Sequence, residues 1–166
     1  MIKNLILIGM PGCGKSTTGV LVAKALCKSF IDTDLLIQAS EGCTLQSIIE
    51  QKGNDCFAAL EEKILLGVNE ESSVISTGGS AVYYDSAMNH FKEIGTVVYM
   101  KISFEQMMKR ITNMKTRGIL LKNGETIETM FHRREALYEK YADIIIDCND
   151  STIEDTVEKL CNICDV

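Results

Sequence analysis

The sequence predicts a three-layer α/β fold, in which helices cover both faces of a mostly parallel five-stranded sheet. Short apolar runs alternate with segments of helical spacing along the chain, which is the pattern of such a fold. The length of 166 residues is about that of one domain, so we expect residues 1–166 to form a single domain. Loops that follow parallel strands collect at one edge of the sheet, and any chemistry is expected at that edge.

Five short apolar runs predict the strands. The first ends at a glycine and has the continuous apolar character of a buried central strand. The second closes on the polar triplet Asp32-Thr33-Asp34, and the third runs into Gly78-Gly79. In chain order, the expected strands are residues 2–8, 30–32, 74–76, 96–102 and 144–146.

Segments with apolar residues at helical spacing predict the helices. Gly53-Asn54 marks a break between two of them, and Ser103 is expected to cap the helix that follows the fourth strand. Residues 112–124 lose this spacing and carry two glycines, so we expect a loop or lid there. The expected helices are residues 16–28, 44–52, 55–69, 85–93, the segment after Ser103, 126–141 and 151–161.

Composition and charge exclude several classes of protein. No apolar run approaches the ~18–20 residues that span a bilayer, so we expect no membrane association. The net charge of −6, from 17 basic and 23 acidic residues, argues against a nucleic-acid surface. The first residues lack the features of a secretory leader, which favours a cytoplasmic protein. Nothing marks an association stripe, so a monomer is expected.

The seven cysteines are odd in number and scattered, as expected for reduced thiols that fill small apolar spaces. Cys161 and Cys164 form a C-x-x-C pair without the second pair that a structural zinc site needs. We therefore expect them on one face of the last helix, three residues apart, rather than around a metal.

Residues 9–16, GMPGCGKS, match the phosphate-binding pattern G-x-x-x-x-G-K-[ST] at every position, between an expected strand and an expected helix. Glycines permit positive φ, so that successive N–H groups can face phosphate oxygens at the start of the helix. Lys15 can reach the β- and γ-phosphates, and the Ser16 hydroxyl can ligate Mg²⁺. A plain glycine-rich turn is disfavoured by this context. The loop therefore predicts a nucleoside triphosphate site formed by Gly12, Cys13, Gly14, Lys15, Ser16 and Thr17.

The triplet Asp32-Thr33-Asp34 follows the second strand. Alternation along an extended segment would point both carboxylates to one side. We assign Asp32 to the Mg²⁺ shell and Asp34 to an acceptor hydroxyl, because an alcohol that attacks phosphorus must be aligned and lose its proton. The alternative is a strand-end turn with solvated aspartates or a helix N-cap. Beside a phosphate loop, the functional interpretation is favoured.

At this point the residues resemble those of the shikimate kinase family, within the nucleoside-monophosphate-kinase-like P-loop proteins. The resemblance covers nearly the whole chain and implies ATP and Mg²⁺ as cofactors, with phosphoryl transfer to a ring hydroxyl of shikimate. It also implies strand order 2-3-1-4-5 and a mobile lid. The segments that carry it are GMPGCGKST (phosphate loop), FIDTD (metal and substrate aspartates), STGGS (glycine motif), TRGILL (lid) and RREALYEKYAD (substrate helix).

The resemblance implies further site residues on both sides of the reaction. Lys15 and Arg117 would stabilise the transferring phosphoryl group, Arg117 from the lid, and Asn149 would line the adenine. On the acceptor side, residues 33–62 would bind the substrate. The glycine motif supplies Gly78 and Gly79, the latter through its N–H, and Arg134 would bind the substrate carboxylate.

Two departures from the family's pattern concern the acceptor. Where the family carries F-R-x-x-E, this chain reads Phe57-Ala58-Ala59-Leu60-Glu61, and Ser80 replaces the third glycine. Loss of one of two arginines around a carboxylate removes a charge-assisted hydrogen bond worth ~1.5–3 kcal/mol, or about ten- to two-hundred-fold in affinity. Either Arg133 or a lysine compensates, or the acceptor is not shikimate.

Other functions stay open at this level. The same chemistry could act on another small hydroxy acid or hydroxy amino acid, such as homoserine. A nucleotide kinase would call for more than the four arginines present. A nucleotide switch without an acceptor is disfavoured because the N-K-x-D guanine pattern is missing and the aspartate pair would have no role. A catalytically dead binding module is disfavoured because Lys15, Ser16, Asp34 and Arg117 are all present.

Overall fold

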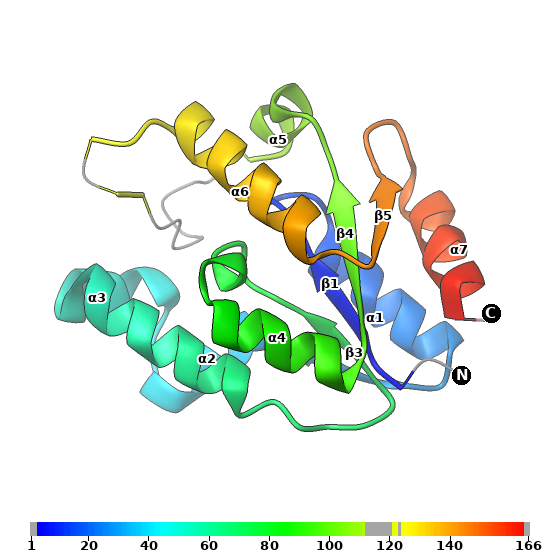
Figure 1. Ribbon diagram of the computed structural model, residues 1–166, viewed down its shortest axis with the longest axis horizontal. Helices are drawn as coiled ribbons and strands as arrows, with labels where there is room; N and C mark the ends of the chain where they lie inside the picture. The colour runs from blue at the N-terminus through cyan, green and yellow to red at the C-terminus, as the bar shows by residue number, and fades with distance from the viewer. Residues whose placement is uncertain (1–2, 112–120, 123, 165–166) are drawn as a thin grey trace.

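The structure is a computed structural model that describes residues 3–111, 121, 122 and 124–164 (Figure 1). Its sheet has the order β2-β3-β1-β4-β5, and every neighbouring pair is parallel. The predicted strand order is therefore confirmed. The strands are β1 (Leu5–Ile8), β2 (Ser29–Asp32), β3 (Ser73–Ser76), β4 (Thr96–Lys101) and β5 (Ile144–Asp147).

Helices cover both faces of this sheet, as the sequence predicts. In Figure 1, α1 and α7 lie together on one side of the strands, α4 and α6 lie on the other, and α2 pairs with α3. The helices are α1 (Lys15–Ala25), α2 (Thr33–Glu41), α3 (Leu45–Leu66), α4 (Asp85–Ile94), α5 (Phe104–Arg110), α6 (Ile127–Tyr141) and α7 (Ile153–Cys164), with a 3₁₀ turn η1 (Ala81–Tyr83).

The centre of the main core is β1, whose four residues are fully buried. Ile6 pairs with Ile75 of β3 on one side and with Val97 of β4 on the other. A strand covered on both faces has no solvent side, which is why its sequence is continuously apolar rather than alternating. The prediction of a buried central first strand is confirmed.

Helix α2 was not predicted. Asp32 is extended at the end of β2, but the expectation that the extended segment continues through Thr33 and Asp34 is wrong, because α2 begins at Thr33. The Asp32 carboxylate accepts hydrogen bonds from the N–H groups of Asp34 and Leu35, at 3.0 and 3.4 Å. This N-cap satisfies the first-turn donors and starts the helix at Thr33. Gly42, with a φ of 67°, ends it.

Helix α3 consists of two helical stretches that meet at a kink, so the predicted break at Gly53-Asn54 is confirmed. Gly53 has a φ of 81° and a ψ of 167° inside the helix, a conformation that favours glycine. Three buried side chains of α3 pack with Ile37 of α2 in a second apolar cluster, while Leu65 near the end of α3 belongs to the main core. The buried members of this α2–α3 cluster are Ile37, Leu45, Ile48 and Phe57.

The remaining helix boundaries follow their caps and contacts. Ser103 caps α5 as predicted, because its hydroxyl accepts from the Gln106 N–H at 3.2 Å. Helix α7 extends to Cys164, since Cys161 and Cys164 both pack against the main core. In the part of the chain that the structure describes, no helix has the length and apolar character needed to cross a membrane.

Candidate active site

The loop between β1 and α1 depends on three glycines at special backbone positions. Gly9, Gly12 and Gly14 have φ values of 151°, 79° and 100°. A Cβ on Gly9 would also lie 2.8 Å from the Met100 carbonyl oxygen. Inside the loop, Lys15 Nζ donates to the carbonyl oxygens of Gly9 and Met10 at 2.7 and 3.0 Å. The buried ammonium therefore holds the loop closed on itself.

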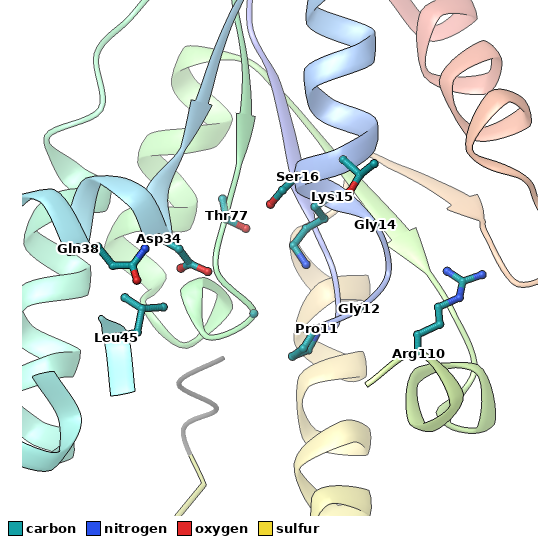
Figure 2. Close-up of a pocket in the computed structure, with 12 residues that line it drawn as sticks. Pro11, Gly12, Gly14, Lys15, Ser16, Asp34, Gln38, Leu45, Thr77 and Arg110 are labelled. Carbon is teal, nitrogen blue, oxygen red and sulfur yellow. The ribbon is translucent and has the colours of Figure 1, made fainter. Parts of the chain in front are cut away.

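This loop forms one wall of a cavity of about 600 Å³, a size typical of small-molecule sites. Figure 2 shows Lys15 and Ser16 on one side and Asp34 and Gln38, from α2, across the gap. The lining residues are Pro11, Gly12, Gly14, Lys15, Ser16, Thr17, Asp34, Gln38, Leu45, Thr77, Gly79 and Arg110. The cavity thus lies at the carboxyl edge of the sheet, where the chemistry was expected.

Ser16 and Asp32, the two residues predicted to hold Mg²⁺, are in direct contact. The Ser16 hydroxyl donates to Asp32 Oδ2 at 2.7 Å and lies 3.3 Å from the Ser76 hydroxyl. Among the described residues there is no cluster of three or more histidine, cysteine or acidic side chains for a metal. Mg²⁺ needs no such cluster, because it prefers oxygen ligands and is usually bound by one or two protein groups, waters and phosphates. The hydroxyl–carboxylate pair fits that requirement.

Asp34 faces the phosphate loop from the first turn of α2. Burial, reinforced by the nearby Asp32 carboxylate and opposed by Lys15, raises the pKa of Asp34 to about 6. The carboxyl is therefore largely ionised at pH 7 and is a stronger base than an ordinary aspartate. Its Oδ1 lies 2.6 Å from where a Cβ on Gly78 would stand. Any larger residue at position 78 would displace the Asp34 carboxylate.

The glycine turn after β3 connects the cavity to Arg134. Gly79 lines the cavity, and Gly78 donates its N–H to the Thr33 hydroxyl at 3.2 Å. Arg134, only 1% exposed on α6, places Nη1 2.7 Å from where a Cβ on Gly79 would stand. Arg134 itself is not among the described lining residues. The structure thus places Arg134 directly behind Gly79, a residue that lines the cavity.

A second cavity, of about 240 Å³, adjoins the phosphate loop on the side of β5. The loop after β5 contributes Cys148, Ser151 and Thr152 to it, but the Asn149 side chain is occupied elsewhere. Asn149 Oδ1 accepts from the Ser103 N–H at 2.7 Å. The residues on either side of Asn149 thus line this cavity and Asn149 does not, while the predicted contact of this segment with adenine stays a prediction.

Arg110, at the end of α5, was missed by the sequence reasoning. It lines both cavities and donates from Nη2 to the carbonyl oxygens of Cys148 and Asn149, at 3.1 Å each. An available signal was its position as one of four arginines, directly before the expected lid. Arg117, predicted to act from that lid, lies outside the described residues.

Comparison with known proteins agrees with this geometry. The family model described as shikimate kinase matches residues 11–165. The chain belongs to the shikimate kinase family. It is similar to the shikimate kinase of Sulfurihydrogenibium sp. (strain YO3AOP1), with 36% identity over 96% of both chains. The shikimate kinase of Clostridium botulinum (strain 657 / Type Ba4) is 40% identical over 89% of both.

Solved structures of shikimate kinases have the same fold. The enzyme from Acinetobacter baumannii, in complex with shikimate, superposes with a TM-score of 0.87 at 27% identity, covering 99% of this chain and 93% of that one. The enzyme from Aquifex aeolicus vf5 gives a TM-score of 0.83 at 34% identity, covering 98% and 96%. A thymidylate kinase from Candida albicans, at 14% identity and a TM-score of 0.60, shares the fold alone.

Where the shikimate kinase family pattern F-R-x-x-E has an arginine, this chain has Ala58, and the glutamate of the pattern, Glu61, has hydroxyl partners. Ala58 is half-buried on α3, and the following Glu61 is 1% exposed. Glu61 accepts from the Ser80 hydroxyl at 2.8 and 2.7 Å and from the Tyr84 hydroxyl at 2.8 Å. Sequence reasoning missed this role, because a glutamate in a helix is usually solvated; its place in the F-x-x-x-E pattern was the available signal.

Arg133, one of the candidates to compensate for Ala58, has other partners. Its Nη2 donates to Glu125 at 2.9 Å and to the Tyr83 hydroxyl at 2.8 Å. The same hydroxyl accepts from Arg134 Nε at 2.8 Å, so Tyr83 lies between the two arginines. Within the described part of the chain, Arg133 does not line the 600 Å³ cavity. Of these two arginines, Arg134 is the one that lies against a residue of the cavity wall, Gly79.

Proposed function

We propose that this protein transfers the γ-phosphoryl group of ATP to a ring hydroxyl of shikimate, giving shikimate 3-phosphate and ADP. The observation that carries the proposal is the position of Asp34, which faces Lys15 and Ser16 across one cavity (Figure 2). A kinase needs a phosphate-binding group and a base on opposite sides of the transferred group. Membership of the shikimate kinase family supports shikimate as the acceptor.

Each residue would act through its chemistry and its place. The loop and Lys15 would hold the triphosphate, and Asp34 would align the attacking hydroxyl and receive its proton. Bound Mg²⁺ would neutralise charge on the phosphates, with Ser16 and Asp32 as its protein partners. Arg134, beside Gly79, would bind the carboxylate of shikimate. Arg117 would add positive charge at the transferred group, as in the family pattern.

The nucleotide base would lie in the second cavity. Arg110 borders both cavities there and is fixed to the loop after β5 by two hydrogen bonds. A planar guanidinium can stack on an aromatic base. The site thus has a nucleotide side near β5 and an acceptor side near α2 and α3. This division supports binding of two small molecules at the same time.

Ala58 favours one alternative acceptor class. With alanine in place of the family's arginine, the pocket has less positive charge, which would suit a hydroxy amino acid with an ammonium group, such as homoserine. This alternative keeps the phosphate loop, Asp34 and the chemistry unchanged. It differs only in what α3 and Arg134 bind.

An acceptor screen with coupled detection of ADP tests the proposal. We expect ADP release from MgATP that depends on added shikimate, and its loss in Asp34→Asn. Homoserine-dependent release without a response to shikimate would replace the acceptor by the alternative. ATP binding without any acceptor-dependent ADP release would refute the kinase function.

A further inference from the structure

Glu61 is a buried carboxyl group held by hydroxyls. Two hydroxyl donors, from Ser80 and Tyr84, account for three hydrogen bonds to its oxygens. None of the ion pairs within the described residues includes Glu61. A buried carboxylate without a paired cation is unusual, because its charge is poorly compensated.

The neighbours of Glu61 place it beside the acceptor side of the site. Glu61 Oε1 and Asp34 Oδ1 lie 3.0 and 2.6 Å from the same point, the position of a Cβ on Gly78. The next residue, Gly79, has Arg134 Nη1 at 2.7 Å from the equivalent point. The titratable and charged groups that face Glu61 are therefore Asp34 from α2, Tyr84 from the segment after η1 and Arg134 from α6.

We propose that Glu61 takes up a proton from solvent when the carboxylate of the acceptor binds at Arg134, with Ser80 and Tyr84 holding the carboxyl in both forms. The inference rests on the proposed function, since it takes shikimate as the ligand. The step is a simple protonation: the carboxylate gains H⁺ and becomes a carboxylic acid, with no other bond changed.

Electrostatics gives the direction of this coupling. The acceptor carboxylate adds a negative charge to a region that already holds Asp34 and Glu61. The described cations nearby are Arg134, which faces Glu61, and Lys15, which acts on Asp34. Burial is the largest cause that raises the pKa of Glu61 to about 7, so that a small further rise protonates it near neutral pH. The bound carboxylate supplies that rise.

The hydroxyl partners suit a group that changes its protonation state. A hydroxyl can donate to a carboxylate and can also accept from a carboxylic acid. Burial raises the pKa of Tyr84, so it stays a protonated donor throughout the neutral range. A guanidinium only donates and favours the ionised carboxylate. Ser80 and Ala58 together thus permit a change that an arginine at position 58 would oppose.

Calorimetric titration of the protein with shikimate in the presence of ADP tests the proposal. Runs at pH 7.5 in two buffers of different ionisation enthalpy give the number of protons taken up on binding. We expect uptake of a substantial fraction of one proton in the wild-type protein and none in Glu61→Gln. The matched control is Glu62→Gln, because Glu62 is the adjacent residue and its carboxylate bonds to Ser86 instead. It should retain the wild-type uptake.

Kinetics gives an independent readout. Above about pH 7, the KM for shikimate should rise with pH in the wild-type protein, with about tenfold per pH unit as the upper limit for linkage to one proton. The KM of Glu61→Gln should lack this dependence. An unchanged slope in Glu61→Gln would overturn the proposal.

A second variant keeps the test valid if Glu61→Gln fails to fold. Ala58→Arg places a guanidinium three residues before Glu61, on the same face of α3. It should hold Glu61 ionised and abolish proton uptake. Shikimate binding without proton uptake by the wild-type protein, or wild-type uptake retained in Ala58→Arg, would refute the inference while leaving the kinase function intact. Absence of both binding and turnover would refute the proposed function itself, and the inference with it.

Discussion

The hydroxyl of Ser16 donates to Asp32 Oδ2 at 2.7 Å and so joins the first turn of α1 to the end of β2. The other oxygen of the same carboxylate caps α2. One side chain therefore serves both a phosphate-loop hydroxyl and the start of the helix that carries Asp34. The N-cap interpretation of this aspartate is confirmed. Its contact with Ser16 is compatible with the predicted Mg²⁺ role, which stays a prediction.

Asp32→Ala should therefore affect stability and metal dependence together. Loss of the cap should cost about 1 kcal/mol in the free energy of unfolding. Loss of the carboxylate beside Ser16 should raise the Mg²⁺ concentration needed for half-maximal activity. The control is Thr126→Ala, which removes the N-cap of α6. Thr126→Ala should lose a comparable amount of stability but keep the wild-type Mg²⁺ dependence. The same change in Mg²⁺ dependence in both variants would contradict the assignment of Asp32 to the metal.

Lys15→Met should abolish phosphoryl transfer while leaving the fold intact. Removal of one preorganised donor to developing charge typically costs a factor of about 10²–10³ in kcat. The measurement is kcat at saturating ATP and shikimate, with circular dichroism as the check on folding. Lys24→Met, an exposed change on the same helix, should have no effect. Undiminished kcat in Lys15→Met would remove the residue from the mechanism.

Asp34→Asn should lower kcat far more than it weakens ATP binding. Loss of a general base typically costs about 10²–10⁴-fold. Asn keeps the size of the side chain, so the packing against Gly78 is preserved. The comparison is kcat against the Kd for ATP, with the exposed Asp55→Asn as the control. Equal losses in both quantities would indicate a binding role instead.

Gly79→Ala should weaken acceptor binding through Arg134. The new Cβ would lie 2.7 Å from Arg134 Nη1 and 3.2 Å from the Pro11 ring, so the guanidinium must move. We expect the KM for shikimate to rise about tenfold or more, the cost of one charge-assisted hydrogen bond. Gly67→Ala, at a helix end with ordinary φ, should leave the KM unchanged. A normal KM in Gly79→Ala would place the acceptor elsewhere.

Glu61→Gln should change how stability depends on pH. The pKa of Glu61 is raised from 4.5 to about 7 in the folded state, so the folded protein binds this proton more tightly than the unfolded chain. The resulting stability is present below about pH 4.5 and is lost as pH rises through 7. Relative to Glu61→Gln, the wild-type protein should lose on the order of 2–3 kcal/mol between pH 5 and pH 8. Urea unfolding of both proteins at these two pH values measures it, and a constant difference would disprove the shift.

The nucleotide side was predictable because its determinants are consecutive. Eight residues from Gly9 to Ser16 specify the loop conformation, the lysine and the metal hydroxyl in one pattern. The strand order followed from the family resemblance, which covers nearly the whole chain. By contrast, α2 was missed because the signal of its N-cap, Asp32, was taken for an extended pair of carboxylates.

The acceptor side depends on contacts between distant segments, which a single sequence does not reveal. Glu61 is buried because η1 and the segment after it pack against α3, 19 residues away at Ser80 and 23 at Tyr84. Arg110 borders the cavities only because α5 returns to the loop after β5. The sequence shows that Ala58 and Ser80 depart from the family's pattern. Only the structure shows that both lie close to Glu61, to which the Ser80 hydroxyl donates.

The α2–α3 cluster has a consequence for how the protein fluctuates. Ile37, Ile48 and Phe57 are buried with one another and not with the main core, which α3 joins only through Leu65. We therefore expect α2 and the part of α3 before Leu65 to open as one cooperative unit. Its amide hydrogens should exchange with deuterium through partial openings that leave β1 and the phosphate loop protected. The proposed acceptor would then bind against helices that open locally, while the triphosphate would bind against a loop that stays closed.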